Sequence, residues 1–271
     1  MIVREPEFFP PTANALGSIG RLVLFACRRA GQALILLGET VWSLRFVFTP
    51  RARREVVDQM FVYGIRSLGV ITIVAVFTGM ILALQTGIEL RRFNQEVNIG
   101  TAVMVSMLRE MGPFMTGLIL AACVGSAMAA QIGTMTVNDE IASLEIMSID
   151  PVRYLMTPRL AAMMVMTPIL SFYTCMLGVL GGGLVGMTQI NVPWDQYIKT
   201  AMDNASTKDL FVGLFKALLF GLMITVVSCY EGFTAVQGAM GVGRAVRRSV
   251  ITSFLLVLIV GYFVTRFFYL E

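Results

Sequence analysis

Long apolar stretches separated by short polar segments occupy most of the chain after residue 60. A helix needs about 20 apolar residues to cross the hydrocarbon core of a bilayer, and five stretches are about this long or longer. They cover residues 64–85, 99–133, 160–187, 210–229 and 250–268. The pattern predicts an all-α integral membrane protein with about five transmembrane helices, in a membrane domain that covers residues 61–271.

The second stretch is too long for one simple crossing. As a single helix, residues 99–133 would extend about 52 Å, whereas the hydrocarbon core is about 30 Å thick. Gly112 and Pro113 lie near its middle, so the sequence predicts that the helix breaks there. Small residues then recur at every fourth position: Gly117, Ala121, Gly125, Ala129 and Gly133. This spacing predicts close helix packing, because small side chains let two backbones approach.

The first 60 residues are predicted to form a separate N-terminal segment, cytoplasmic or interfacial. Charged residues interrupt residues 14–48 so often that no 18 consecutive residues are free of charge. An amphipathic helix in the membrane interface, with its arginines reaching the headgroups, fits this pattern better than a span. We expect Thr49-Pro50 to end that helix.

Residues 134–159 are the only substantial polar insert in the middle of the chain. Thr136 and Asp139 match a capping box and predict a short helix over about 136–149. This helix would carry acids and an apolar face: Asp139, Glu140 and Glu145, with Val137, Ile141, Leu144 and Met147. Such a surface suits a docked partner protein, although a plain solvated helix has the same pattern.

Basic residues are distributed unevenly between the predicted loops. Nine of the 21 Lys and Arg residues precede residue 67. The loops after the second and fourth spans hold two and three, and the loops after the first and third hold two each. Because basic loops stay in the cytoplasm, we predict a cytoplasmic N-terminus, a cytoplasmic 134–159 segment and a C-terminus on the opposite side.

Composition argues against catalysis by this chain. The chain is 56% apolar and 14% charged, and it contains no histidine, which removes Ser-His-Asp triads and His-ligated metals. Its three lysines, Lys199, Lys208 and Lys216, do not lie in a Gly-Lys-Ser/Thr phosphate loop. We therefore expect no enzyme activity, metal or cofactor, and an energy source outside the chain.

Three ionisable residues are predicted at membrane depth: Arg109, Glu110 and Lys216. Charges there are costly and by default suggest function. As neighbours on a helix, Arg109 and Glu110 point about 100° apart, so each is free to meet a different group. They either bind a charged headgroup or form a structural ion pair that fixes helix register.

Two long segments resemble a known family. The run LREMGPFMTGLILAACVGSAMAAQIGTMTVNDEIASLEIMSIDPVRYLMTPR, residues 108–159, resembles the signature region of the Mla-type (MlaE) ABC lipid transporter permeases. The run YEGFTAVQGAMGVGRAVRRSV, residues 230–250, resembles the family's second motif. Similarity extends over about residues 20–269. The chain departs from the usual pattern at Cys123 and Gln131, where the family has Arg and Glu.

The resemblance implies a homodimeric permease in the bacterial inner membrane, with a periplasmic C-terminus. It implies a cytoplasmic ATPase that binds ATP, a periplasmic MCE-domain protein, a small cytoplasmic STAS-domain regulator and a phospholipid substrate, with no nucleic acid. The coupling helix to the ATPase would fall on residues 138–148. The lipid site would lie between the two copies, near the first span and the pair Arg109 and Glu110. We add Lys216 as a second basic group, and Leu82 and Gln85 as candidate site residues on the first span.

Two other functions remain open from the residues alone. An ion-coupled secondary transporter is disfavoured by the odd number of spans, the lack of an inverted repeat and a single acid at predicted membrane depth. A membrane scaffold that transports nothing would use the same charges to fix register.

Overall fold

The structure is a computed structural model and describes residues 24, 28, 31–33, 35–40, 42–43 and 50–270. Over this part of the chain it is helical, without a β-strand. Five helical stretches are long and apolar enough to cross a membrane: Arg53–Arg92, Glu96–Val137, Val152–Gln189, Thr207–Phe233 and Gly238–Tyr269. The predicted all-α membrane protein with about five spans is confirmed.

Ten α-helices are described. They are α2 (Pro50–Tyr63), α3 (Leu68–Arg92), α4 (Ile99–Ser106), α5 (Gly112–Leu120), α6 (Ser126–Val137), α7 (Glu140–Ile146), α8 (Thr157–Gln189), α9 (Trp194–Asp203), α10 (Thr207–Phe233) and α11 (Gly238–Tyr269). Several join end to end, so that α2 and α3 form the first span and α4, α5 and α6 form the second.

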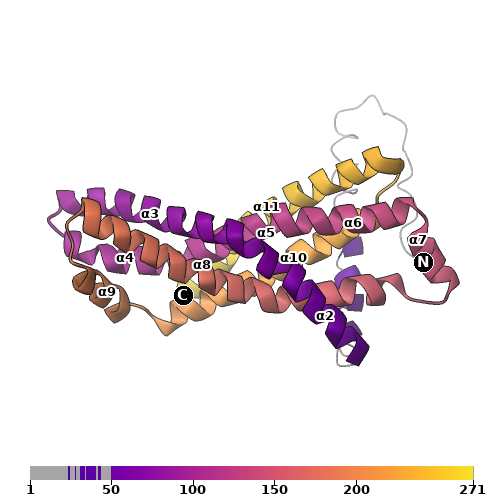
Figure 1. The fold of residues 1–271 in the computed structure, drawn as a ribbon, viewed down its shortest axis with the longest axis horizontal. Helices are drawn as coiled ribbons and strands as arrows, with labels where there is room; N and C mark the ends of the chain where they lie inside the picture. The colour runs from indigo at the N-terminus through magenta and orange to yellow at the C-terminus, as the bar shows by residue number, and fades with distance from the viewer. Residues whose placement is uncertain are drawn as a thin grey trace.

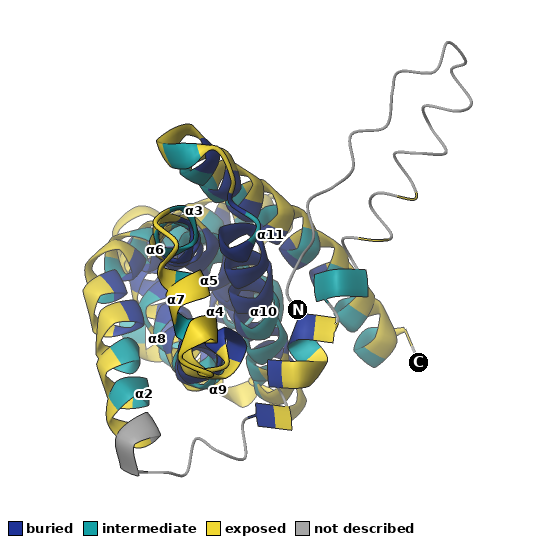
Figure 2. Cartoon of the chain, turned by 90° about the vertical axis from the view of Figure 1, so that its right-hand side faces the viewer, coloured by how far each residue is buried: buried dark blue, intermediate teal, exposed yellow. Residues whose placement is uncertain are grey.

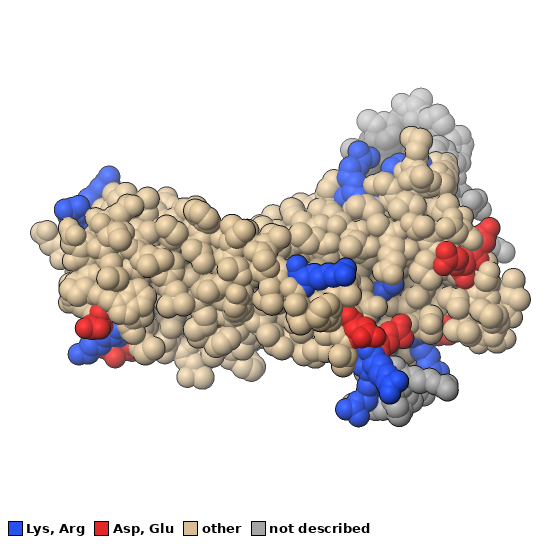
Figure 3. Space-filling model, in the orientation of Figure 1, with Lys and Arg blue, Asp and Glu red and all other residues tan. Residues whose placement is uncertain are grey.

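The spans form an elongated bundle with α7 at one end and α9 at the other (Figure 1). The most enclosed span is α10, with 56% of its most apolar window buried, against 22% for α11. Figure 2 shows buried residues on the inner sides of the helices and exposed residues on the outer sides. Charged side chains lie at the left end and over the right-hand half of the visible face, and a basic side chain also lies near its middle (Figure 3).

The second span continues through Gly112-Pro113, so the predicted break is wrong. A π-helical turn over Met107–Met111 precedes the proline, and the N–H of Gly112 donates to the carbonyl of Met107. The wider turn accommodates the proline, which has no N–H to give and whose ring crowds the preceding turn. A second π-helical turn follows at Ala121–Gly125.

Small residues allow the tightest helix contacts, as predicted. The stripe on the second span faces α10 and α11: a Cβ on Gly125 would lie 2.9 Å from the Ser228 hydroxyl. The closest crossing, however, joins α3 to α8. A Cβ on Gly79 would lie 1.8 Å from the carbonyl oxygen of Gly178. Backbone therefore packs directly on backbone there.

Two segments differ from the sequence-based expectation. The capping box at Thr136 is wrong, because α6 continues to Val137 and the Thr136 hydroxyl donates to the carbonyl of Ile132 (2.8 Å). The short helix α7 begins instead after Asp139, whose φ of 58° turns the chain. Residues 194–203, where the sequence predicts a loop, form α9.

Helix α9 is held by its one buried aromatic residue. The Tyr197 hydroxyl donates to the carbonyl of Val179 (2.9 Å), and its ring stacks on Trp194. Burial raises the pKa of the Tyr197 phenol, which therefore stays neutral and keeps its donor proton.

The predicted interfacial helix over residues 14–48 lies largely outside the described residues. Its described pieces are helical. Leu36 is buried, the Thr40 hydroxyl lies 3.2 Å from the Met156 sulfur, and the Thr157 hydroxyl donates to that of Ser43 (3.1 Å). The first span begins just before the predicted boundary between residues 60 and 61, within α2.

Replacing Gly79 with Ala is expected to destabilise the bundle by about 1–3 kcal/mol or more, because the added methyl group meets the backbone of Gly178. Gly69→Ala on the same helix is the matched control, since a Cβ there meets nothing within 4 Å. Thermal unfolding of both variants in detergent checks this. Equal unfolding midpoints for the two variants would show that α3 and α8 can move apart to accept the methyl group without loss of stability.

Candidate functional site

The π-helical turn before Pro113 shapes the candidate site. Pro113 has no N–H, so the carbonyl of Arg109, four residues earlier, receives no ordinary helical hydrogen bond. The Lys216 ammonium donates to this carbonyl instead, with Nζ 2.7 Å from the oxygen. A lysine of α10 thus satisfies a backbone group that the proline of α5 leaves free.

Lys216 also binds two side chains and is only 1% exposed. Its Nζ donates to Glu110 Oε1 (2.6 Å) and to Thr265 Oγ1 (2.6 Å). The Thr265 hydroxyl in turn donates to Glu110 Oε1 (2.5 Å). All three ammonium protons therefore have acceptors, as a buried charge requires.

Arg109 forms a second ion pair with α10, at Asp209. Its Nε and Nη2 donate to Asp209 Oδ1 (2.7 Å) and Oδ2 (3.2 Å), a two-bond contact. The Asp209 side chain is 2% exposed. It also accepts from the Tyr269 hydroxyl (2.5 Å) and lies in the first turn of α10, where the helix dipole favours a negative charge.

Arg109 keeps donors for another ligand. Its guanidinium has five N–H groups, and the Asp209 pair uses two of them. Its Cζ lies over the Tyr269 ring, 4.5 Å from the ring centroid, and the Arg109 side chain remains 41% exposed. Asp209 and Tyr269 thus hold the partly exposed guanidinium group of Arg109 in one orientation.

The structure joins Arg109, Glu110 and Lys216 through direct contacts, and neither Leu82 nor Gln85 of the first span makes a hydrogen bond to them. Leu82 packs in an apolar cluster with Met107 and Met111, which flank Arg109 and Glu110 in the sequence. Gln85 is exposed, and no hydrogen bond or ion pair joins it to the described part of the chain.

The predicted coupling residues divide between two faces of α7. Leu144 packs with Ile141 against the core of the bundle, so it does not belong to the outer surface. Asp139, Glu140 and Glu145 are exposed. Met147 is 60% exposed and its neighbour Ile146, which the sequence reading omitted, is 84% exposed. Acids beside uncovered apolar side chains form the outer face of this end.

Comparison with known proteins places the chain in a family. The family model described as Permease MlaE matches residues 56–267. The chain belongs to the MlaE permease family. This confirms the family resemblance, and the five apolar spans make this MlaE-family chain a multi-pass membrane protein.

Relatives of this MlaE-family chain are permeases by name. A probable ABC transporter permease of Rickettsia conorii is 34% identical over 94% of the chain and 98% of its own length. Another from Rickettsia prowazekii is 37% identical over 79% and 83%. The intermembrane phospholipid transport system permease protein MlaE of Haemophilus influenzae is 32% identical over 93% and 96%.

Sequence reasoning missed Asp209, Thr265 and Tyr269. Asp209 lies just outside the predicted fourth span, residues 210–229, and the structure places it in the first turn of α10. Only the fold shows that this first turn lies beside Arg109. Thr265 and Tyr269 are four residues apart and therefore share one face of α11. This spacing of two hydroxyl groups was the available signal for them in the sequence.

Glu110→Gln is expected to lower the free energy of unfolding by about 1–3 kcal/mol, because it leaves the buried Lys216 ammonium without its half-exposed counter-ion. Adding Lys216→Met should restore part of this loss. Glu89→Gln, which breaks an exposed pair with Arg92, should change stability by less than about 0.5 kcal/mol. Thermal unfolding in detergent measures all three, and indistinguishable single variants would contradict a buried ion pair.

Proposed function

We propose that this chain is the membrane-spanning subunit of an ABC transporter that moves phospholipid between the inner and outer membranes of a bacterium. A separate subunit would hydrolyse the ATP. Membership of the MlaE permease family and the name of the Haemophilus relative support this proposal. The chain itself would act as a non-catalytic path for the lipid.

The half-exposed guanidinium of Arg109 carries the substrate proposal. A phospholipid site needs a phosphate-binding group next to an apolar surface. Arginine suits phosphate because its planar fork donates two hydrogen bonds together, and Arg109 has three N–H groups beyond those bound to Asp209. Leu82 and Gln85 of α3 would line the acyl side.

Glu110 and Lys216 would support Arg109 rather than touch the lipid. Because all three ammonium protons of Lys216 are occupied, it has no donor left for a phosphate. It would fix the Arg109 backbone through the carbonyl of that residue. The alternative that these charges only fix helix register predicts the same contacts but no dependence of lipid binding on Arg109.

The assembly that fits this role is a homodimer with three kinds of partner. Its cytoplasmic ATPase would dock on the outer face of α7, against the coupling residues Asp139, Glu140, Glu145 and Met147 together with Ile146. An MCE-domain protein would bind on the periplasmic side, and a STAS-domain protein would regulate the complex. The basic loops support a cytoplasmic N-terminus and a periplasmic C-terminus.

Arg109→Lys should lower the phospholipid retained by the purified protein about tenfold, although the charge is kept, because lysine cannot reproduce the fork. Mass spectrometry of extracted lipid gives the amount per protein. Arg91→Lys, an exposed substitution at the far end of α3, is the control. Folding is compared by size-exclusion profile. Unchanged retention in a folded Arg109→Lys variant would favour the register role.

Glu140→Lys and Met147→Asp should each weaken co-purification of the ATPase several-fold, because they reverse the charge or the polarity of the α7 surface. Asp195→Lys on α9, at the opposite end, should have no effect. Binding of a cytoplasmic ATPase at α7 would also fix the orientation of the chain. If both α7 variants retain the ATPase, the docking site lies elsewhere, and an absent ATPase would favour an ion-coupled transporter or scaffold.

A further inference from the structure

The first span bends between α2 and α3. Residues Ile65–Ser67 form a 3₁₀-helical turn at this point, directly after Gly64. A 3₁₀ turn inside a long helix is typical of a hinge, because its hydrogen bonds have poorer geometry than those of an α-helix. In Figure 1, α3 runs along the long axis of the bundle, whereas α2 slants away from that direction. The turn therefore sets the angle between the two helices.

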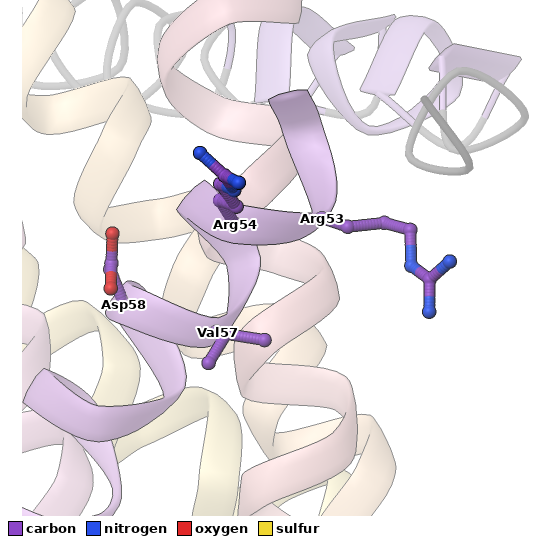
Figure 4. Close-up of a pocket in the computed structure, with 4 residues that line it drawn as sticks. All are labelled: Arg53, Arg54, Val57 and Asp58. Carbon is purple, nitrogen blue, oxygen red and sulfur yellow. The ribbon is translucent and has the colours of Figure 1, made fainter. Parts of the chain in front are cut away.

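One side of α2 packs on the bundle. Val56 and Met60 pack against the core cluster that contains Tyr63, and α2 contacts α8. The other side is exposed and carries the four residues that line a surface cavity: Arg53, Arg54, Val57 and Asp58 (Figure 4). Contacts on the α8 side therefore decide where α2 lies.

Arg159 of α8 is a buried cation that faces α2. It is 3% exposed, and its Nη1 is buried without a hydrogen-bond partner in the described part of the chain. The Tyr63 hydroxyl and the Cys229 thiol lie within electrostatic reach of the guanidinium. Both groups are neutral, so they do not balance its charge. Because an unbalanced buried charge is costly, this position lacks an anion.

Glu55 is an acid of α2 that can supply this negative charge. It is half-buried and lies next to the packed residue Val56. Its carboxylate interacts electrostatically with Arg159, yet it forms no hydrogen bond or ion pair with any residue that the structure describes. Glu55 precedes Gly64 by nine residues, about 14 Å of helix. A small change of angle at the turn therefore moves Glu55 much further than it moves Tyr63.

We propose that α2 has a second, latched position in which Glu55 forms an ion pair with Arg159. The angle changes at the turn over Gly64–Ser67, α2 moves toward the start of α8, and the carboxylate accepts a hydrogen bond from the free Nη1. The pair joins the first span to the third at the end of the bundle that carries α7 (Figure 1). This latch does not rest on the proposed function, because the position of α2 is measured without lipid transport or ATP hydrolysis.

The distance between spin labels at Val57→Cys and Tyr154→Cys reports the position of α2 relative to the start of α8. Both sites are exposed. The labelled full chain, with Cys27 and Cys123 replaced by Ser, is co-expressed with excess unlabelled chain and placed in nanodiscs, so that distances within one chain are measured. We expect two populations, the shorter distance belonging to the latched position.

Glu55→Gln should lower the short-distance population about tenfold, because it removes a charge-assisted bond to a buried guanidinium. Asp58→Asn is the matched control, since Asp58 is an exposed acid on the outer side of the same helix, and it should leave the distribution unchanged. A single distance, or a distribution that Glu55→Gln does not alter, would overturn the latch.

Arg159→Met tests the other partner. If the two residues act as a pair, adding Arg159→Met to Glu55→Gln should cause no further loss of the short-distance population. Further loss would overturn the pairing. Replacing chloride with gluconate tests whether a soluble anion binds Arg159 instead, and it needs no Arg159 variant that must fold. We expect no change, and an equal response to chloride in the parent and in Glu55→Gln would rule out Glu55 as the counter-ion.

Discussion

The bond from Lys216 to the carbonyl of Arg109 organises the centre of the bundle. A transmembrane segment must satisfy every backbone polar group without water, and Pro113 leaves one carbonyl of the second span without its usual donor. A lysine is a costly donor to bury. Here its charge is balanced by Glu110, the residue next to the free carbonyl, so one side chain satisfies the backbone and the ion pair together.

The same turn explains why two ion pairs lie side by side. Arg109 and Glu110 point in different directions from adjacent positions of the π-helical turn. Asp209 and Lys216 are seven residues apart, two helical turns, and therefore share one face of α10. Each charge of the second span meets its own partner on α10. Tyr269 and Thr265 of α11 complete the hydrogen bonds, so three spans meet at this point.

Exposure within this network differs between the residues of the second span and those of α10, and only Arg109 has hydrogen-bond donors left over. Asp209 and Lys216 are buried, whereas the side chains of Arg109 and Glu110 are 41% and 42% exposed, and Arg109 has donors left. If the network only fixed the register of the helices, an exposed guanidinium at Arg109 would add nothing. Without its buried partners, an exposed guanidinium would not hold one orientation. The arrangement combines a rigid base with an accessible fork, which is the property a phosphate site needs.

The sequence by itself determined the fold class, the number of spans, the three charged residues and the family, because span length, charge cost and long motifs are properties of local stretches. It could not determine the partners of those charges. Asp209 is 100 residues from Arg109 in the chain, and its position three residues after Ser206 is equally typical of a helix start. The fold also reversed the expected break at Pro113, because a π-helical turn and a lysine from another span replaced the lost hydrogen bond. It also showed that Leu144 packs against the bundle while Ile146 and Met147 are exposed, since only packing decides which face of a short helix the bundle covers.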